Sequence, residues 1–234
     1  MSGGDDGLYR AVTGFAASVP WLAGPAVAVT EYGLFLVVPA IVAMLWWARS
    51  RGPRALASAL WVPCSVALAF GVDSVIKALV AEPRPCWAVT GVRPLLPCDP
   101  PADFSFPSNH TAIVAAFAAA VFLVRRRWAI PAGIFALLIG LSRVYVGAHY
   151  PHDVLAGLVV GAGVGMSGVL ARSSTTRFIS RHVPRSGRQH ADKVRPSEFK
   201  ESRMTLGRQM RRGRRLHGSG WSRTDHGSPT TSSH

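Results

Sequence analysis

Charged residues are scarce in this chain, and their scarcity argues against an ordinary soluble domain. Only 16% of the 234 residues are charged, while 49% are hydrophobic. Cysteine is also rare: Cys64, Cys86 and Cys98 are the whole set, and no two of them form a CxxC pair. Three cysteines at these spacings exclude a disulfide-rich framework and a CxxC-based zinc or redox site. What remains is an apolar chain whose fold depends on long hydrophobic segments.

Acidic residues are the minority among the charges, with 12 Asp or Glu against 26 Lys or Arg. Most of the net charge of +14 lies in residues 172–234, which hold 15 Lys or Arg and 4 Asp or Glu. A basic tail suits nucleic acid or an anionic membrane surface. Zinc-ligand spacing and aromatic stacking motifs are missing from it, so nucleic acid is the weaker prediction. We expect a disordered cytoplasmic tail that is solvated or lies on anionic inner-leaflet lipid.

The chain begins with acidic residues, Asp5 and Asp6 ahead of Arg10, which is the wrong charge for a secretory signal. Residues 8–19 are mildly apolar and are expected to form a short helix at the membrane surface. Five strongly apolar runs follow, at residues 26–48, 55–80, 110–124, 128–142 and 154–171. Runs of this length and hydropathy predict membrane-spanning helices. A soluble bundle is disfavoured because a chain of this size could not bury five such runs.

The predicted fold is therefore all-α, an integral-membrane bundle of about five transmembrane helices with a short N-terminal interfacial helix. Residues 1–25 form the interfacial segment, 26–171 the membrane domain and 172–234 the tail. Basic residues at 49–54 and 125–127 mark one set of helix ends as cytoplasmic. The N-terminus is then outside. Polar residues from three distant stretches share the outer ends of the helices: Lys77, Arg84, Ser108, His110, Arg143, His149 and Asp153.

The first stretch holds Lys77 and Arg84, seven residues apart and so about two helical turns. Pro83 and Pro85 should end the helix just before Arg84. Two cations near one helix end suit a cluster of anionic oxygens, although anchoring at lipid headgroups is an equal alternative. Asp73 lies one turn before Lys77 and could pair with it for structural or functional reasons.

The second stretch is residues 106–111, FPSNHT, directly before an apolar run. Ser108 or Asn109 can cap the helix, and the free N–H groups of the first turn can bind an anion. His110 is placed to protonate a leaving oxygen. By itself, the pattern is equally typical of an ordinary helix start.

The third stretch is residues 142–153, SRVYVGAHYPHD. Its His149 and Asp153 are four residues apart, so the carboxylate can hold the imidazole in one tautomer and leave its other nitrogen free to attack. Arg143 can hold phosphoryl oxygens, and Pro151 suits a helix start. His152 is the competing histidine and should point elsewhere on the turn.

A metal site is an alternative, since His110, His149, His152 and Asp153 are all possible ligands. Lys and Arg at the same helix ends argue against a metal among them, and neither a metal nor another cofactor is expected.

Taken together, Lys77-x6-Arg84-Pro85, Pro107-Ser-Asn-His110 and Ser142-Arg-x5-His149-x3-Asp153 resemble the three-part signature of the type 2 phosphatidic acid phosphatase (PAP2) superfamily, which includes vanadium haloperoxidases. The resemblance covers roughly residues 8–171. The 28–33 region, with Glu31-Tyr32-Gly33, and the third stretch are most similar to bacterial undecaprenyl-diphosphate phosphatases of the bacitracin-resistance type.

The resemblance implies a metal-independent lipid phosphatase in the bacterial plasma membrane, with its site on the extracytoplasmic face. It implies that His149 is the nucleophile of a phosphohistidine intermediate, Asp153 its orienting partner and His110 the general acid. The phosphoryl oxygens would be bound by Lys77, Arg84, Ser108, Arg143 and the backbone of Asn109. Glu31, Asp73 and His152 are possible accessory residues.

The implied substrate is a polyprenyl diphosphate in the outer leaflet. Phosphatidylglycerophosphate, phosphatidate and glycosylated polyprenyl phosphates remain alternatives. An inactive membrane scaffold and a soluble haloperoxidase are disfavoured, the first by intact motifs and the second by the apolar runs. A disulfide between Cys86 and Cys98 is left open, because an outer loop permits one.

Overall fold

The computed structural model describes residues 2–170, and every regular element in this range is helical. The elements are α1 Ser2–Ser18, α2 Pro20–Tyr32, the 3-10 helix η1 Gly33–Leu36, α3 Val37–Arg49, α4 Pro53–Val80, α5 Pro85–Ala88, α6 Asn109–Val124, α7 Arg126–Tyr145 and α8 Pro151–Met166. The predicted all-α class is confirmed. The basic tail lies outside the described residues.

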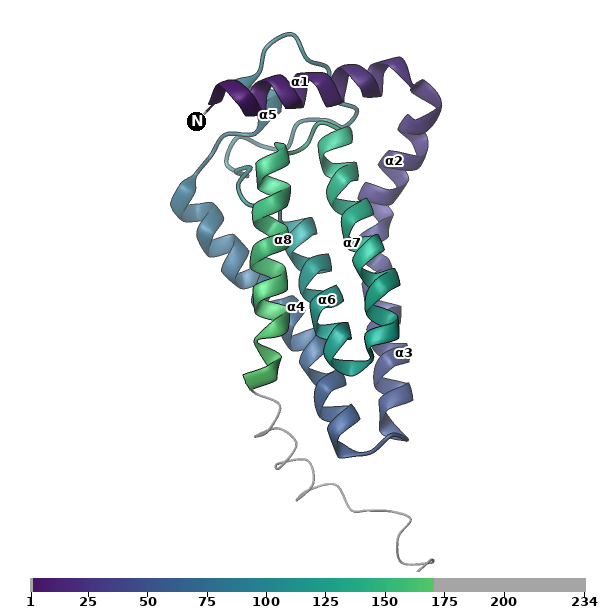
Figure 1. Cartoon of the computed structure of the whole chain (residues 1–234). Coiled ribbons are helices and arrows are strands. Elements are labelled where there is room, and N and C mark those ends of the chain that lie inside the picture. The colour runs from purple at the N-terminus through teal and green to yellow at the C-terminus, as the bar shows by residue number, and fades with distance from the viewer. Residues whose placement is uncertain (1, 171–234) are drawn as a thin grey trace, which may run out of the picture. The chain divides into compact units, whose positions relative to one another are not determined.

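Four helical segments are long and apolar enough to cross a membrane: Pro20–Arg49, Pro53–Ala88, Arg126–Tyr145 and Pro151–Leu170. Asn109–Val124 is a shorter apolar helix. These are the five runs expected from the sequence, but the first helix begins at Pro20 rather than near residue 26, because Pro20 supplies a helix start that the hydropathy pattern does not reveal. In Figure 1, α1 runs across the ends of α7 and α8.

The short helix α6 is the centre of the bundle and packs against α4, α7 and α8. Its contact with α8 depends on glycine. A Cβ at Gly157 would lie 2.7 Å from the carbonyl oxygen of Ser108, and one at Gly161 would lie 2.8 Å from the Cβ of Ala115. This close helix packing sets the position of the first turn of α8 against the first turn of α6.

The two basic loops lie together at one end of the bundle. Arg51 and Arg125 both stack on the ring of Trp47, with their guanidinium carbons 5.2 and 5.5 Å from its centroid. Trp47 also meets Trp128 edge to face. In Figure 1 the α3–α4 and α6–α7 turns are at this end, while α1, α5 and the long loop before α6 are at the other.

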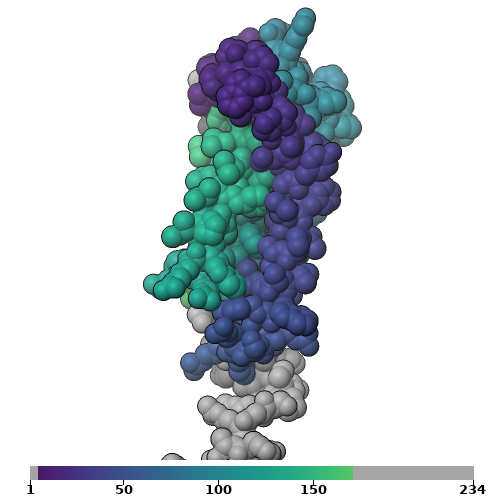
Figure 2. Space-filling model, turned by 90° about the vertical axis from the view of Figure 1, so that its right-hand side faces the viewer, coloured from purple at the N-terminus to yellow at the C-terminus, as the bar shows by residue number. Residues whose placement is uncertain are grey.

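An apolar furrow of about 470 Å³ opens on the side of the bundle between α3, α6 and α7. Its walls include Met44, Phe117, Val121 and Phe135. Figure 2 faces this side, with the α2–α3 segment and α7 running next to each other. Many neighbouring side chains, such as Phe35 and Leu137, are more than half exposed, as expected for surfaces that contact lipid.

Candidate active site

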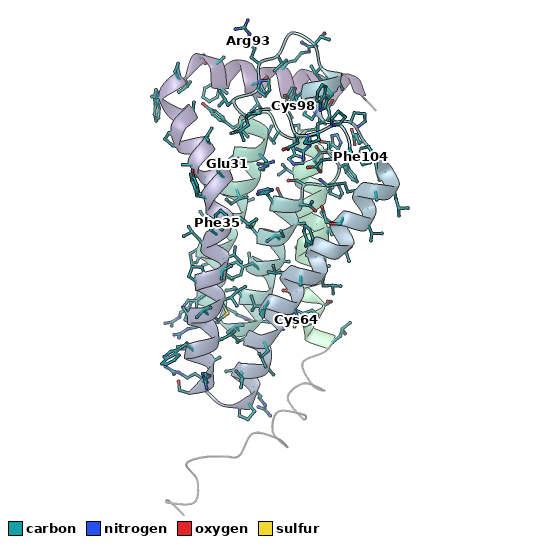
Figure 3. The ribbon with its side chains drawn as sticks, turned by 180° about the vertical axis from the view of Figure 1, so that it is seen from behind. Glu31, Phe35, Cys64, Arg93, Cys98 and Phe104 are labelled. Atoms are coloured by element: carbon teal, nitrogen blue, oxygen red, sulfur yellow. A yellow bond between two sulfur atoms is a disulfide. The ribbon has the colours of Figure 1, made fainter. Side chains whose placement is uncertain are left out.

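A cavity of about 490 Å³ lies at the end of the bundle opposite the basic loops. Polar residues from all three sequence stretches line it, together with one residue of α2: Lys77, Arg84, Asn109, His110, Arg143, His149 and Glu31. Figure 3 shows Glu31 on α2, and Cys98 and Phe104 on the loop before α6, around this end. The structure therefore brings the three distant stretches together, as the sequence predicted.

His149 follows a tight turn at the end of α7. Gly147 has φ +82°, a left-handed conformation that glycine adopts without steric cost, and its carbonyl oxygen accepts a 2.9 Å hydrogen bond from the Tyr9 hydroxyl. The turn directs the His149 ring inward, where only 1% of the residue is exposed. Helix α1 therefore helps to hold the loop that carries this histidine.

The two ring nitrogens of His149 face different partners. Nδ1 lies 3.3 Å from Oδ2 of Asp153, and Nε2 lies 3.5 Å from Nη1 of Arg84. Burial, and then the positive charges of Arg143, Arg84 and Lys77, lower the pKa of His149 well below its usual value of 6.5. A neutral ring with its proton on Nδ1 satisfies both contacts and leaves the Nε2 lone pair on the cavity side.

Asp153 is held in the first turn of α8, which begins at Pro151 as predicted. Its Oδ2 accepts a 2.8 Å hydrogen bond from the backbone N–H of Tyr150 and a short one from the hydroxyl of Ser105. The Ser105 hydroxyl is also 3.5 Å from Nδ1 of His149. Sequence reasoning missed Ser105, because a serine in a proline-rich loop carries no periodic or motif signal.

Lys77 and Arg84 meet acidic residues that the sequence analysis did not select. Arg84 contacts Asp99 at 2.9 Å and Asp103 at 2.8 Å, while Nζ of Lys77 lies 3.6 Å from Asp103 and donates to the carbonyl oxygen of Phe104. Partial burial acts to raise the pKa of Asp103, but Arg84 and Lys77 outweigh it and the pKa is lowered. The carboxylates of Asp99 and Asp103 thus occupy positions on Lys77 and Arg84 at which the oxygens of a phosphate could bind instead.

The possible pairing of Asp73 with Lys77 is not formed in this structure. Asp73 is fully buried, and neither of its carboxylate oxygens has a hydrogen-bond partner. Lys77 extends instead toward the loop, because the carbonyl oxygen of Phe104 and the carboxylate of Asp103 are both at its tip. Asp73 is also absent from the cavity wall.

Arg143 is the cation of the cavity without a counter-ion. The residue is 5% exposed, and its Nε is buried without a hydrogen-bond partner. Within the described residues, no carboxylate lies within 4.0 Å of its guanidinium. A buried guanidinium is costly unless an anion pairs with it, so its position beside His149 points to an anionic ligand in the cavity.

The second stretch contributes unevenly. His110 and Asn109, in the first turn of α6, line the cavity. Ser108 occupies the N-cap position, but the expected capping bond is not formed: its buried hydroxyl accepts instead from the hydroxyl of Thr111 at 3.1 Å. The backbone N–H of Ser108 donates to the carbonyl oxygen of Asp153 and so ties α6 to α8.

The loop over the cavity is closed by a disulfide. Cys86 and Cys98, whose pairing the sequence leaves undecided, form this disulfide, with their Cα atoms 6.0 Å apart. Both cysteines line the cavity, next to Asp99. Glu31, from α2, also lines the cavity, and among residues 5–170 it forms no ion pair.

His152 points away from this cavity, as expected from its place on the turn. Its Nδ1 lies 3.2 Å from Asp5, and its Nε2 lies 3.1 Å from Glu82 and 3.2 Å from Oδ1 of Asp153. Glu82, His152 and Asp153 are the described residues whose side chains could hold a metal ion. The cavity around His149 presents cations instead.

Comparison with known proteins identifies the family. Residues 58–177 match the PAP2 superfamily. The chain is 33% identical over 158 residues to the undecaprenyl-diphosphatase BcrC of Bacillus subtilis, covering 68% of this chain and 79% of that one. It is 32% identical over 156 residues to an undecaprenyl-diphosphatase of Sulfolobus acidocaldarius, covering 65% and 72%.

The fold agrees with that match. The crystal structure of Aquifex aeolicus LpxE superposes with a TM-score of 0.52 at 22% identity, over 70% of this chain and 93% of that one. The sequence match spans most of the membrane bundle, and the three stretches that carry the family signature converge on one cavity in the structure. The chain therefore belongs to the PAP2 superfamily.

Proposed function

We propose that this protein is a membrane phosphatase that hydrolyses a polyprenyl diphosphate, undecaprenyl diphosphate, to the monophosphate through a phosphohistidine intermediate. The observation that carries the proposal is the arrangement around His149. Its Nδ1 is 3.3 Å from Asp153, while its Nε2 shares a cavity with Lys77, Arg84 and the guanidinium of Arg143, which has no carboxylate partner among the described residues.

The first step is attack by Nε2 of His149 on the terminal phosphorus. An N–P bond forms, and the bond from phosphorus to the bridging oxygen breaks. The leaving group is the polyprenyl monophosphate, whose oxygen receives a proton from His110 on the same cavity wall. Positive charge develops on the His149 ring, and Asp153 stabilises it from the Nδ1 side.

The second step releases inorganic phosphate. A water molecule attacks the phosphohistidine, His110 takes its proton, and the N–P bond breaks to return neutral His149. Burial and the nearby cations lower the pKa of His149, which keeps the free ring in the neutral form that the attack of the first step requires.

The three cations Arg143, Lys77 and Arg84 stabilise the negative charge of the transferred phosphoryl group. Phosphoryl transfer depends on positioning and on stabilising charge on the equatorial oxygens. Arg143 has no counter-ion among the described residues, and Lys77 and Arg84 are held by loop carboxylates that are nearly half exposed. An incoming phosphate can pair with Arg143 directly and displace Asp99 and Asp103 from Arg84.

The lipid is inferred from the relatives and from the cavity. The two relatives compared above are named for undecaprenyl diphosphate, and their matches cover 68% and 65% of this chain. The cavity also has apolar walls at Leu34, Phe70 and Ile113, against which the first isoprene units can pack. A headgroup in this cavity and a tail in the adjoining bilayer suit a membrane-bound substrate.

We further propose a bacterial plasma membrane with the cavity on its outer side. The basic loops that contain Arg51 and Arg125 lie at the other end of the bundle and favour the cytoplasmic face. With this orientation, the enzyme recycles carrier lipid that is released as diphosphate on the outer leaflet.

The test is phosphate release by purified full-length protein in detergent. Undecaprenyl diphosphate, phosphatidylglycerophosphate and phosphatidate are compared at equal concentration, and the diphosphate is expected to have the highest kcat/KM. His149→Ala should lose on the order of 10³-fold or more of the activity, and His190→Ala, in the tail, is the matched control. Substrate radiolabelled in its terminal phosphate should give acid-labile, base-stable protein label in the wild type and in His190→Ala, but not in His149→Ala.

A higher kcat/KM for another lipid would refute the proposed substrate but not the phosphohistidine mechanism. Full activity in His149→Ala would refute the nucleophile.

A further inference from the structure

A second cavity, of about 440 Å³, lies on the far side of Asp153 from the first. It is lined by residues from the start of α1, the end of α4, the loop before α6 and the start of α8: Asp5, Asp6, Val80, Glu82, Phe106, Tyr150 and His152. The polar side chains that line it are three carboxylates, one imidazole and the phenol of Tyr150. Neither Lys nor Arg is among these lining residues, which is the reverse of the charge pattern around His149.

Three side-chain atoms converge between this cavity and Asp153. Nε2 of His152 lies 3.1 Å from Oε2 of Glu82 and 3.2 Å from Oδ1 of Asp153, and all three atoms lie within 4.8 Å of one another. Ligands about 2.0–2.1 Å from a tetrahedral metal ion are separated by about 3.3 Å. The observed separations need only small movements to accept such an ion.

The ring of His152 is held in place by the residues around it. Its Nδ1 lies 3.2 Å from Oδ2 of Asp5 without forming a hydrogen bond, while its Nε2 is hydrogen-bonded to Oε2 of Glu82 at 3.1 Å. A metal ion that binds Nε2 replaces the proton between His152 and Glu82, because an imidazole ligand must be deprotonated at the binding nitrogen. The ring stacks between Phe106 and Tyr150, with centroid distances of 5.7 and 5.3 Å. The position of the ring is thus set partly by groups outside the cluster itself.

Asp153 supplies a separate observation. The residue is completely buried, and its Oδ1 has no hydrogen-bond partner, even though Nε2 of His152 is 3.2 Å away. Its other oxygen is fully occupied by Tyr150, Ser105 and His149. A buried carboxylate oxygen without a donor is costly, and a cation in contact with Oδ1 removes that cost.

We propose that Glu82, His152 and Asp153 form a binding site for a divalent transition-metal ion, Zn²⁺ or Mn²⁺. One imidazole and two carboxylates suit these ions, and the adjoining cavity admits water to the remaining coordination positions. Asp5 acts as the outer partner that orients His152. The expectation of no metal rested on Lys and Arg at this end of the bundle, and those cations line the other cavity.

The site has two structural consequences. It joins the end of α4, through Glu82, to the start of α8, and through Asp5 it also fixes the start of α1. It also shares Asp153 with the active site, with one oxygen toward the metal and the other toward His149. Metal binding therefore makes the carboxylate a weaker partner for the His149 ring.

The experiment measures binding by isothermal titration calorimetry of Zn²⁺ and, separately, Mn²⁺ into the full-length protein in detergent after removal of metal by chelator. Glu82→Gln removes a ligand charge and should lower the affinity at least tenfold. Asp5→Asn weakens the outer contact and should lower it about 10- to 100-fold. Asp6→Asn removes a carboxylate of the same cavity that does not contact His152, and it should bind like the wild type.

Thermal unfolding with and without metal gives the second readout. The wild type and Asp6→Asn should unfold at higher temperature with metal, and Glu82→Gln should show a smaller shift or none. The tail histidines are present in every variant, so metal bound there cancels in the comparison. Circular dichroism and gel filtration verify that each variant folds. Asp5 is partly exposed, so Asp5→Asn still tests the proposal if Glu82→Gln does not fold.

Equal metal affinity in the wild type, Glu82→Gln and Asp5→Asn would overturn the proposal. So would a wild type that gains no thermal stability from either ion, in which case His152 is a protonated histidine held by Asp5 and Glu82.

Discussion

Replacing Arg143 by methionine should stabilise the protein and at the same time inactivate it. Arg143 is 5% exposed, its Nε has no hydrogen-bond partner, and no described carboxylate pairs with it. A buried charge without a partner costs several kcal/mol, and replacing buried ionic groups by apolar ones of similar volume stabilises by about 1–4 kcal/mol. Because the arginine faces a cavity, we expect the lower part of that range for Arg143→Met.

The loss of activity follows from the same geometry. Arg143 lines the cavity with His149 and can donate two charge-assisted hydrogen bonds to a phosphoryl group. At about 1.5–3 kcal/mol each, their loss lowers kcat/KM by about 10²- to 10⁴-fold. Inorganic phosphate at a hundred times its Kd should stabilise the wild type by about 2.7 kcal/mol and should stabilise Arg143→Met much less.

The assay is thermal or denaturant unfolding in detergent, with and without phosphate, together with phosphate release from undecaprenyl diphosphate. Arg127→Met is the matched control, since Arg127 is exposed at the opposite end of the bundle and its replacement should change stability by less than about 0.5 kcal/mol. An Arg143→Met protein that is less stable than the wild type without phosphate, or that keeps full activity, would refute the reasoning.

Two further predictions concern pH and helix packing. Burial and the charges of Arg143, Arg84 and Lys77 lower the pKa of His149, so protonation should begin to lower kcat/KM only well below pH 6.5; a pH profile whose acid limb lies at or above 6.5 would contradict this. Gly157→Ala should destabilise the bundle by about 1–3 kcal/mol, because its Cβ would meet the carbonyl oxygen of Ser108 at 2.7 Å. Gly163→Ala, with nothing within 4 Å, should stabilise it by up to about 1 kcal/mol, and equal unfolding temperatures for the two variants would show that α6 and α8 do not pack closely.

Local sequence features anticipated much of the candidate site. His149 and Asp153 are four residues apart across a helix start, and Pro83 and Pro85 end α4 before Arg84. Such short-range relations follow from helix geometry and proline sterics. The pairing of Asp73 with Lys77 had the same kind of support and is not formed, because a carbonyl and a carboxylate from a distant loop lie closer to the lysine.

The contacts of the loop before α6 could not be predicted from the sequence. Its prolines exclude regular structure, so no period indicates which side chains turn inward. Only the folded loop, closed by Cys86 and Cys98, places Ser105 on Asp153 and Asp103 on Arg84.

The sequence by itself determined the membrane bundle, because the length and apolarity of each run decide whether a helix can lie in lipid. It also determined the three groups of reactive residues and their order. The tertiary structure alone decided what each group contacts. His152 turns toward Asp5 and Glu82, and Asp153 presents one oxygen to His149 and the other to that second cluster. The physical reason is that these contacts join residues as far apart as α1 and α8, and their geometry depends on how closely α6 and α8 approach through glycine.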